Sequence, residues 1–333
     1  MIDDHETRRA IALDMSIRKP LVGKKFDGYF NTSYGHELYW QKILPNGDIK
    51  AILFYFHGYA DHSSWFIHDH MMKFVEKGYL VVAADCRGHG KSTGLHCYID
   101  SFDLLILELK EHILNQMSTL SSYNKSIFFV GESMGAMCAT KVYSIISEKD
   151  ILSSFKGIVL IAPLLGMGPN SSPSPVLRAA LNVLAFLFPS KPWVPQAVAN
   201  DKAVKDENVR KEALLNKLYY RAPPRCKTAL ELLVASESMS ELSTKSTFSF
   251  LICHGSGDVI TSPIVSQNFF KNSPSEDKTY LLYDGVWHAM LSGEPESTRN
   301  KVYNDIFEWL GSRVGKESMT ANRFDKIEEF SNL

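Results

Sequence analysis

Short apolar runs alternate with helical segments along most of this 333-residue chain. The runs have the length and composition of buried strands and lie at 49–56, 79–84, 126–130, 157–162, 248–253 and 279–283. Between them, apolar residues recur with helical spacing at 65–76, 102–117, 134–146, 263–270 and 298–310. Strands that alternate with helices form a mostly parallel sheet covered on both faces. We therefore predict an α/β fold, with an antiparallel hairpin over 26–43 at the sheet edge.

One region, residues 164–227, interrupts this alternation. It begins with a Gly/Pro/Ser-rich piece and continues with a run, 176–188, that is apolar nearly all round. The run could be a helix buried in the core or a helix of an inserted cap, and its irregular flanks between two strands favour the cap. The expected organisation is an N-terminal extension (1–20), a core in two parts (21–163 and 228–314), the cap insertion (164–227) and a polar C-terminal tail (315–333).

Composition excludes several classes of protein. The 36 basic and 37 acidic residues give a net charge of −1, which disfavours nucleic acid as a partner. The 5 cysteines are scattered without CxxC spacing, so reduced thiols are expected rather than a disulfide framework or a zinc knuckle. Neither a secretory leader nor an apolar stretch near the roughly 18 residues of a spanning helix is visible. These features predict a cytoplasmic protein.

The pentapeptide GESMG, from Gly131 to Gly135, follows an expected strand and begins an expected helix. A serine on such a sharp strand-to-helix turn is exposed as a nucleophile, and the turn needs small residues two positions to either side. The helix N-terminus also favours negative charge at the Ser133 oxygen. The alternative is a glycine-rich turn with an ordinary N-cap serine. The placement between strand and helix favours the nucleophile.

A serine nucleophile needs a base, and the base needs an acid that orients it. Asp258 comes directly after the strand 248–253, and His288 comes directly after the strand 279–283. The order Ser133, Asp258, His288 is that of α/β-hydrolases, and loops after parallel strands meet at one sheet edge. We therefore predict Ser133 as nucleophile, His288 as base and Asp258 as its orienting acid. Asp284 is the weaker candidate for the acid.

Two N–H donors are needed to hold a tetrahedral oxyanion. Met134, which follows the nucleophile, supplies one candidate, and Tyr59, in the loop after the strand 49–56, supplies the other. A plain turn after the strand is the alternative interpretation of that loop.

Other polar residues are interpreted as structural. His89 is expected to shape its loop, His254 to support the site or the core, and Cys138 to pack as a small apolar residue. The cluster His62, His68, Asp69 and His70 fits no zinc pattern and is expected to form a solvated helix face. We predict neither a metal nor a cofactor.

Five ordered segments of the chain resemble the monoacylglycerol lipase family, in particular its plant-type branch with lysophospholipase-like and caffeoylshikimate esterase members. They are HGYADHS (57–63), DCRGHGKS (85–92), GESMG (131–135), HGSGD (254–258), and His288 with the following GEP (293–295). The resemblance covers about residues 26–313. It implies the α/β-hydrolase fold, the triad and oxyanion donors named above, and a cap that forms an apolar acyl channel and contacts membranes peripherally.

The resemblance also implies substrate-binding residues. Asp61 and Trp65 stand where the animal lipases of the family have Glu and Arg, and Leu184 and Phe188 lie on the apolar run of the cap. Monoacylglycerol is the expected substrate, with lysophospholipid and a phenolic ester such as caffeoyl shikimate as alternatives. A non-catalytic ligand-binding protein on the same fold, and acyl transfer to an alcohol other than water, are the remaining alternatives.

Overall fold

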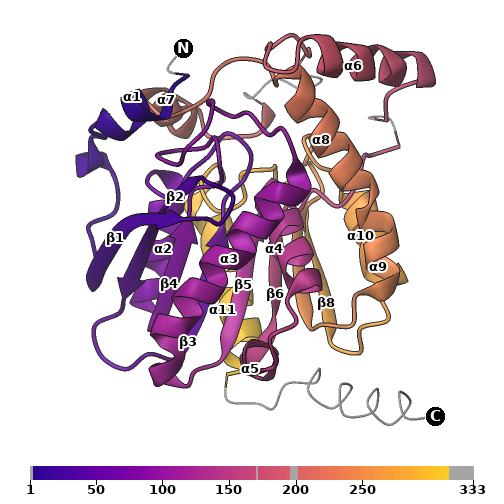
Figure 1. Cartoon of the computed structure of the whole chain (residues 1–333). Coiled ribbons are helices and arrows are strands. Elements are labelled where there is room, and N and C mark those ends of the chain that lie inside the picture. The colour runs from indigo at the N-terminus through magenta and orange to yellow at the C-terminus, as the bar shows by residue number, and fades with distance from the viewer. Residues whose placement is uncertain (1–2, 170–171, 196–201, 315–333) are drawn as a thin grey trace, which may run out of the picture.

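The computed structural model describes residues 3–169, 172–195 and 202–314, which fold around one eight-stranded sheet (Figure 1). The strand order is β1-β2-β4-β3-β5-β6-β7-β8. The pairs β1–β2 and β2–β4 are antiparallel, and all other neighbours are parallel. The strands are β1 (Lys24–Asn31), β2 (Glu37–Leu44), β3 (Ala51–Phe56), β4 (Tyr79–Ala84), β5 (Ile127–Glu132), β6 (Phe155–Ile161), β7 (Phe250–Gly255) and β8 (Lys278–Tyr283). The predicted fold class and the edge hairpin are confirmed.

The central strands are apolar at every position because helices cover both faces of the sheet. Along β3, Ile52 and Phe54 pack in one core cluster, while Leu53 and Tyr55 pack in the other. The first cluster lies under α3 (Phe102–Leu120), α4 (Met134–Ile145) and α10 (Pro263–Asn272), and the second under α2 (Phe66–Glu76) and α11 (Glu296–Gly311). Figure 1 shows these two layers on opposite sides of the sheet.

The predicted elements agree with the structure to within a few residues at their ends. Helices that the sequence pattern did not predict are α1 (His5–Ala10), α5 (Lys149–Ser154), α7 (Glu207–Leu215), α8 (Cys226–Glu237) and α9 (Met239–Lys245). Most of them are short or lie in or near the region where the alternation breaks down. The predicted tail, 315–333, lies outside the described residues.

The apolar run of the predicted cap forms α6 (Pro175–Leu187), which projects at the top of Figure 1, above α8. Its one fully buried residue is Ala185, whereas Val176 is 80% and Phe186 is 84% exposed. Arg178 joins the helix to Glu237 at the end of α8, with 2.8 Å between Nη2 and Oε2. Because its apolar side chains face outward, α6 is not a core helix, and that alternative is wrong.

The N-terminal extension packs against the core. Arg8 on α1 is completely buried, and its guanidinium donates hydrogen bonds of 2.8–2.9 Å to three carbonyl oxygens of the loop after β4, those of Gly90, Ser92 and Gly94. Asp3 accepts a hydrogen bond of 2.6 Å from Arg225 at the start of α8. The extension therefore links the core to the residues that end the predicted cap.

Candidate active site

Ser133 lies between β5 and α4 in a backbone conformation that side-chain-bearing residues rarely adopt, with φ 54° and ψ −119°. The two flanking glycines are required by close backbone contacts. A Cβ at Gly131 would lie 2.4 Å from the oxygen of Gly135, and a Cβ at Gly135 would lie 2.1 Å from the oxygen of Phe56. This is the strand–turn–helix geometry that the pentapeptide predicts.

Asp258 and His288 are in direct contact after neighbouring parallel strands, β7 and β8. His288 Nδ1 lies 2.7 Å from Asp258 Oδ2. The Asp258 side chain is fully buried, and that of His288 is 14% exposed. With Nδ1 donating to the carboxylate, the imidazole is oriented, and its Nε2 is the nitrogen that remains to accept a proton.

The Asp258 carboxylate is held by several donors. Oδ1 accepts from the backbone N–H groups of Ile260 (2.8 Å) and Thr261 (3.1 Å), and Oδ2 lies 2.8 Å from the Thr261 hydroxyl. Burial alone would raise the pKa of Asp258, but the nearby His288 and the hydrogen bonds from both histidines hold it well below its ordinary value. Asp258 is therefore ionised at neutral pH, as an acid that orients and stabilises a protonated imidazole must be.

A second histidine contacts the same carboxylate oxygen. His254 is fully buried, with Nε2 3.2 Å from Asp258 Oδ2 and Nδ1 2.8 Å from the Ser266 hydroxyl. If Nε2 donates to the carboxylate, Nδ1 accepts from Ser266, which fixes the tautomer. The interpretation of His254 as a supporting residue is confirmed. The weaker acid candidate, Asp284, is exposed and instead accepts a 3.0 Å hydrogen bond from Ser256.

Ser133 is connected to this pair through the loop after β6. The Ser133 N–H donates to Ile161 O, and Ser133 O accepts from the N–H of Leu164, both at 3.0 Å. In the same loop, the carbonyl oxygen of Ala162 accepts a hydrogen bond of 3.0 Å from the Thr261 hydroxyl. Within the described residues no hydrogen bond joins the Ser133 hydroxyl to His288. Both side chains are partly exposed at the carboxyl edge of the parallel strands.

The loop after β3 lies against Ser133. A Cβ at Gly58 would come within 3.4 Å of Ser133 Cβ, so the backbone that leads to Tyr59 passes directly beside the nucleophile. Met134 is the first residue of α4, and its N–H therefore has no acceptor within that helix. The two predicted oxyanion donors thus belong to segments adjacent to Ser133, and their role stays a prediction.

Asp85, after β4, holds this loop in place. Its two carboxylate oxygens accept from the backbone N–H groups of Ser63 (2.7 Å) and Lys91 (2.9 Å). His89 in the same turn is buried, with Nδ1 3.1 Å from the carbonyl of Arg87, in agreement with a loop-shaping role. Cys138 is buried in α4, as expected of a packing residue.

The predicted substrate-binding residues have different surroundings. Asp61 is half-buried in the loop after β3, and burial raises its pKa. Trp65 is completely buried, with the Arg18 guanidinium 4.8 Å from its ring centroid, and this favours a packing role over the predicted substrate contact. On α6 and at its end, Leu184 is half-buried and Phe188 is 41% exposed.

The predicted solvated face of histidines is wrong. His68 and His70 on α2 are 7% and 3% exposed, because the N-terminal segment covers His68 while His70 packs toward the sheet. His68 Nε2 lies 3.0 Å from the carbonyl oxygen of Lys19, and His70 Nδ1 lies 2.8 Å from Glu132 Oε1. In the described part of the chain, no group of three or more His, Cys, Asp or Glu side chains has the arrangement of a metal site.

Comparison with known proteins identifies the family. A family model described as serine aminopeptidase, S33, matches residues 47–296. The chain is similar to the caffeoylshikimate esterase of Arabidopsis thaliana, with 30% identity over 289 residues that cover 86% of each protein. It is also similar to the monoglyceride lipase of Homo sapiens, with 27% identity over 278 residues, 83% of this chain and 86% of that one.

Solved structures agree on the fold. A soluble variant of the monoglyceride lipase from Saccharomyces cerevisiae, in complex with a substrate analog, has a TM-score of 0.75 at 19% identity and covers 90% of this chain and 99% of that one. The chain therefore belongs to the family described as serine aminopeptidase, S33, and within it to the monoacylglycerol lipase-like α/β-hydrolases.

Proposed function

We propose that this protein hydrolyses carboxylic esters of long-chain acyl lipids through Ser133, His288 and Asp258. The observation that carries the proposal is the 2.7 Å contact between His288 and the buried Asp258, at the sheet edge where Ser133 occupies a strained turn. Strain of this kind persists only where the surrounding structure supports it, and it is concentrated at functional sites.

In the proposed reaction Ser133 Oγ attacks the ester carbonyl while His288 takes its proton. The ionised Asp258 stabilises the imidazolium that forms. The backbone N–H groups of Tyr59 and Met134 donate to the oxyanion, and His288 then protonates the departing alcohol. Water, activated by His288, attacks the acyl-enzyme and releases the carboxylic acid. Every step uses groups of this chain and water, so no cofactor is needed.

The exposed apolar surface of α6 favours a lipid ester as substrate. Val176, Leu177, Val183, Phe186 and Leu187 are all at least 57% exposed, and a patch of this kind marks a surface for an acyl chain or a membrane. Monoacylglycerol is the first candidate, with lysophospholipid as an alternative. The similarity to a caffeoylshikimate esterase supports a phenolic ester such as caffeoyl shikimate as a second candidate substrate.

A competition assay tests the substrate. Monoacylglycerol, lysophosphatidylcholine and caffeoyl shikimate are mixed at equal concentrations, and the loss of each is followed by mass spectrometry. We expect kcat/KM for monoacylglycerol to exceed that for caffeoyl shikimate by about tenfold or more, since each buried methylene contributes about 0.8 kcal/mol. A preference for caffeoyl shikimate would reject the lipid assignment and keep ester hydrolysis.

Peripheral membrane contact through α6 is part of the proposal. Among the described helices, none combines the length and apolar character needed to cross a bilayer. Phe186→Asp should weaken association with phospholipid vesicles about tenfold, which corresponds to burial of one large apolar side chain. It should also lower turnover of long-chain esters more than that of short-chain esters. Vesicle co-sedimentation and initial rates measure the two effects.

Asn182→Asp is the matched control, because it adds the same charge at an exposed polar position of the same helix. Binding and chain-length preference should stay close to those of the unmodified protein. Equal losses on long and short esters in the Phe186 variant would contradict an acyl-binding role for α6.

Two alternatives predict different products. A non-catalytic binding protein would retain the ester without cleaving it, whereas the intact Asp258–His288 contact favours catalysis. Acyl transfer to another alcohol would share the acyl-enzyme and would appear as a new ester when alcohols are added to the assay.

A further inference from the structure

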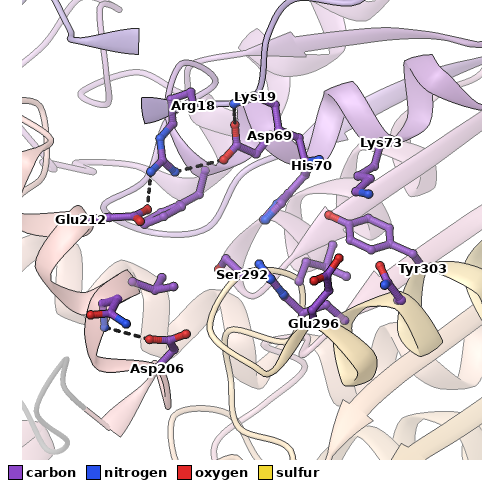
Figure 2. A pocket seen from close by; sticks show the side chains of 16 residues that line it. Arg18, Lys19, Asp69, His70, Lys73, Asp206, Glu212, Ser292, Glu296 and Tyr303 are labelled. Atoms are coloured by element: carbon purple, nitrogen blue, oxygen red, sulfur yellow. Dashed lines mark hydrogen bonds and ion pairs between the residues drawn. The ribbon is translucent and has the colours of Figure 1, made fainter. Parts of the chain in front are cut away.

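A cavity of about 280 Å³, with none of Ser133, Asp258 and His288 in its lining, is shown in Figure 2. Its walls come from four parts of the chain: the segment at Arg18 and Lys19, helix α2, helix α7 of the predicted cap, and helix α11 with the loop before it. The proposed ester hydrolysis uses none of its side chains, so its polar lining requires a separate explanation.

Three side-chain nitrogen atoms of residues that line this cavity are buried without a hydrogen-bond partner in the described structure. His70 is 3% exposed, and its Nε2 makes no hydrogen bond in the described structure. The same holds for Nε of Arg299 on α11 and for Nε of Arg18, of which only the Nη atoms are paired. Figure 2 shows the His70 ring pointing into the space between α2 and the Ser292 loop. A buried donor without an acceptor costs about 1–3 kcal/mol, so donors of this kind are expected to have an acceptor from outside the chain.

The contacts of His70 Nδ1 bear on which ring nitrogen carries the proton. Burial raises the pKa of Glu132 to about 8, so its carboxyl group is protonated at neutral pH. Its Oε1 lies 2.8 Å from His70 Nδ1 and accepts from the Tyr55 hydroxyl, which lies 3.2 Å from the same nitrogen. Burial, with help from Arg299 and Arg18, lowers the pKa of His70 to about 3, so the imidazole is neutral. If Nδ1 accepts a hydrogen bond from one of these two oxygens, the single proton is on Nε2, the nitrogen that has no partner within the described structure.

The charges of the lining are unevenly satisfied. Arg18 is paired with Asp69, at 3.1 Å, and with Glu212. Asp206 caps α7 by accepting from the N–H of Asn208 at 2.8 Å, and Glu296 is exposed. Lys73 and Arg299, in contrast, have no ion-pair partner among the described residues. Burial and the neighbouring Lys19 lower the pKa of Lys73, and the carboxylates of Glu76 and Glu296 offset part of this effect.

We propose that this cavity binds a compact oxyanion, a phosphate or a carboxylate, through His70 Nε2–H, Arg299 and Lys73. A group of this class accepts hydrogen bonds from all three donors at once, and charge-assisted bonds to Arg and Lys are the strong ones. The three donors come from α2 and α11, two helices that cover the same face of the sheet.

Isothermal titration calorimetry tests the proposal on the full chain. Sodium phosphate and sodium acetate are each titrated into the protein at constant ionic strength, and sodium chloride serves as the reference titrant. We expect saturable binding of one anion. Arg299→Gln should weaken it about tenfold or more, the effect of losing one charged hydrogen bond. Lys73→Gln, at a half-exposed residue, is the second variant, and it should weaken anion binding less than Arg299→Gln does. Lys211→Gln, an equal charge change on an exposed position of α7 outside the cavity, should leave the affinity unchanged.

The two titrants distinguish the sources of the anion, since tighter phosphate binding identifies a phosphate site and tighter acetate binding identifies a carboxylate site. Heats no larger than those of chloride, or an equal loss in the Lys211 variant, would overturn the proposal. The same titrations on Ser133→Ala keep the result independent of ester hydrolysis, because binding to this cavity needs no turnover. Circular dichroism confirms that each variant is folded.

Discussion

Ser133→Ala should lower ester hydrolysis about 10⁴-fold or more and abolish labelling by a fluorophosphonate, because the acyl-enzyme can no longer form. The change removes one oxygen atom from a partly exposed side chain, so the fold should be unaffected. Initial rates on a short-chain 4-nitrophenyl ester, together with gel fluorescence after labelling, measure the two effects. The remaining rate would report what the oxyanion donors supply without a nucleophile.

Ser144→Ala is the matched control, since Ser144 is an exposed serine of the same helix, α4, and donates to the carbonyl of Lys141. Its rate and labelling should equal those of the unmodified protein. Undiminished labelling of the Ser133 variant would show that a different residue is the nucleophile.

Asp258→Asn should lower kcat about 10⁴-fold with a much smaller change in KM. An amide cannot stabilise the imidazolium, and its NH₂ group would donate to Nδ1 of His288 and impose the unproductive tautomer. The variant should also be less stable, because the backbone donors of Ile260 and Thr261 lose a charged acceptor in a buried site. Steady-state kinetics and a thermal unfolding midpoint measure these effects.

Asp284→Asn separates the two candidate acids. Asp284 is exposed and accepts from Ser256, so its amide variant should keep nearly full activity. A larger loss in the Asp284 variant than in the Asp258 variant would mean that the orienting acid has been misassigned.

The predictable parts of this molecule are those that depend on neighbouring residues in the sequence. The turn at Ser133 follows from two glycines and a serine between a strand and a helix. Asp258 and His288 meet because each directly follows a strand, and parallel strands end at one edge. Local sequence contains this information, so the fold class and the Asp258–His288 contact could be predicted from it.

The parts that could not be predicted depend on contacts between distant segments. Polar residues on α2 suggested a solvated face, but residues near Lys19 lie across it and bury His68. Trp65 stands at a position expected to contact substrate, yet the distant Arg18 covers its ring. Helical periodicity cannot show which remote segment will cover a polar face.

The buried Arg8 has a practical consequence for anyone who purifies or redesigns this protein. Its guanidinium donates hydrogen bonds to carbonyl oxygens of the loop after β4, and the position of that loop is also set by Asp85. Asp85 in turn holds the loop after β3, which passes beside the Ser133 turn. Trimming the first ten residues as a dispensable leader would leave those oxygens without donors and loosen a segment that touches the reacting centre. Shortened versions made for crystallisation should therefore retain them.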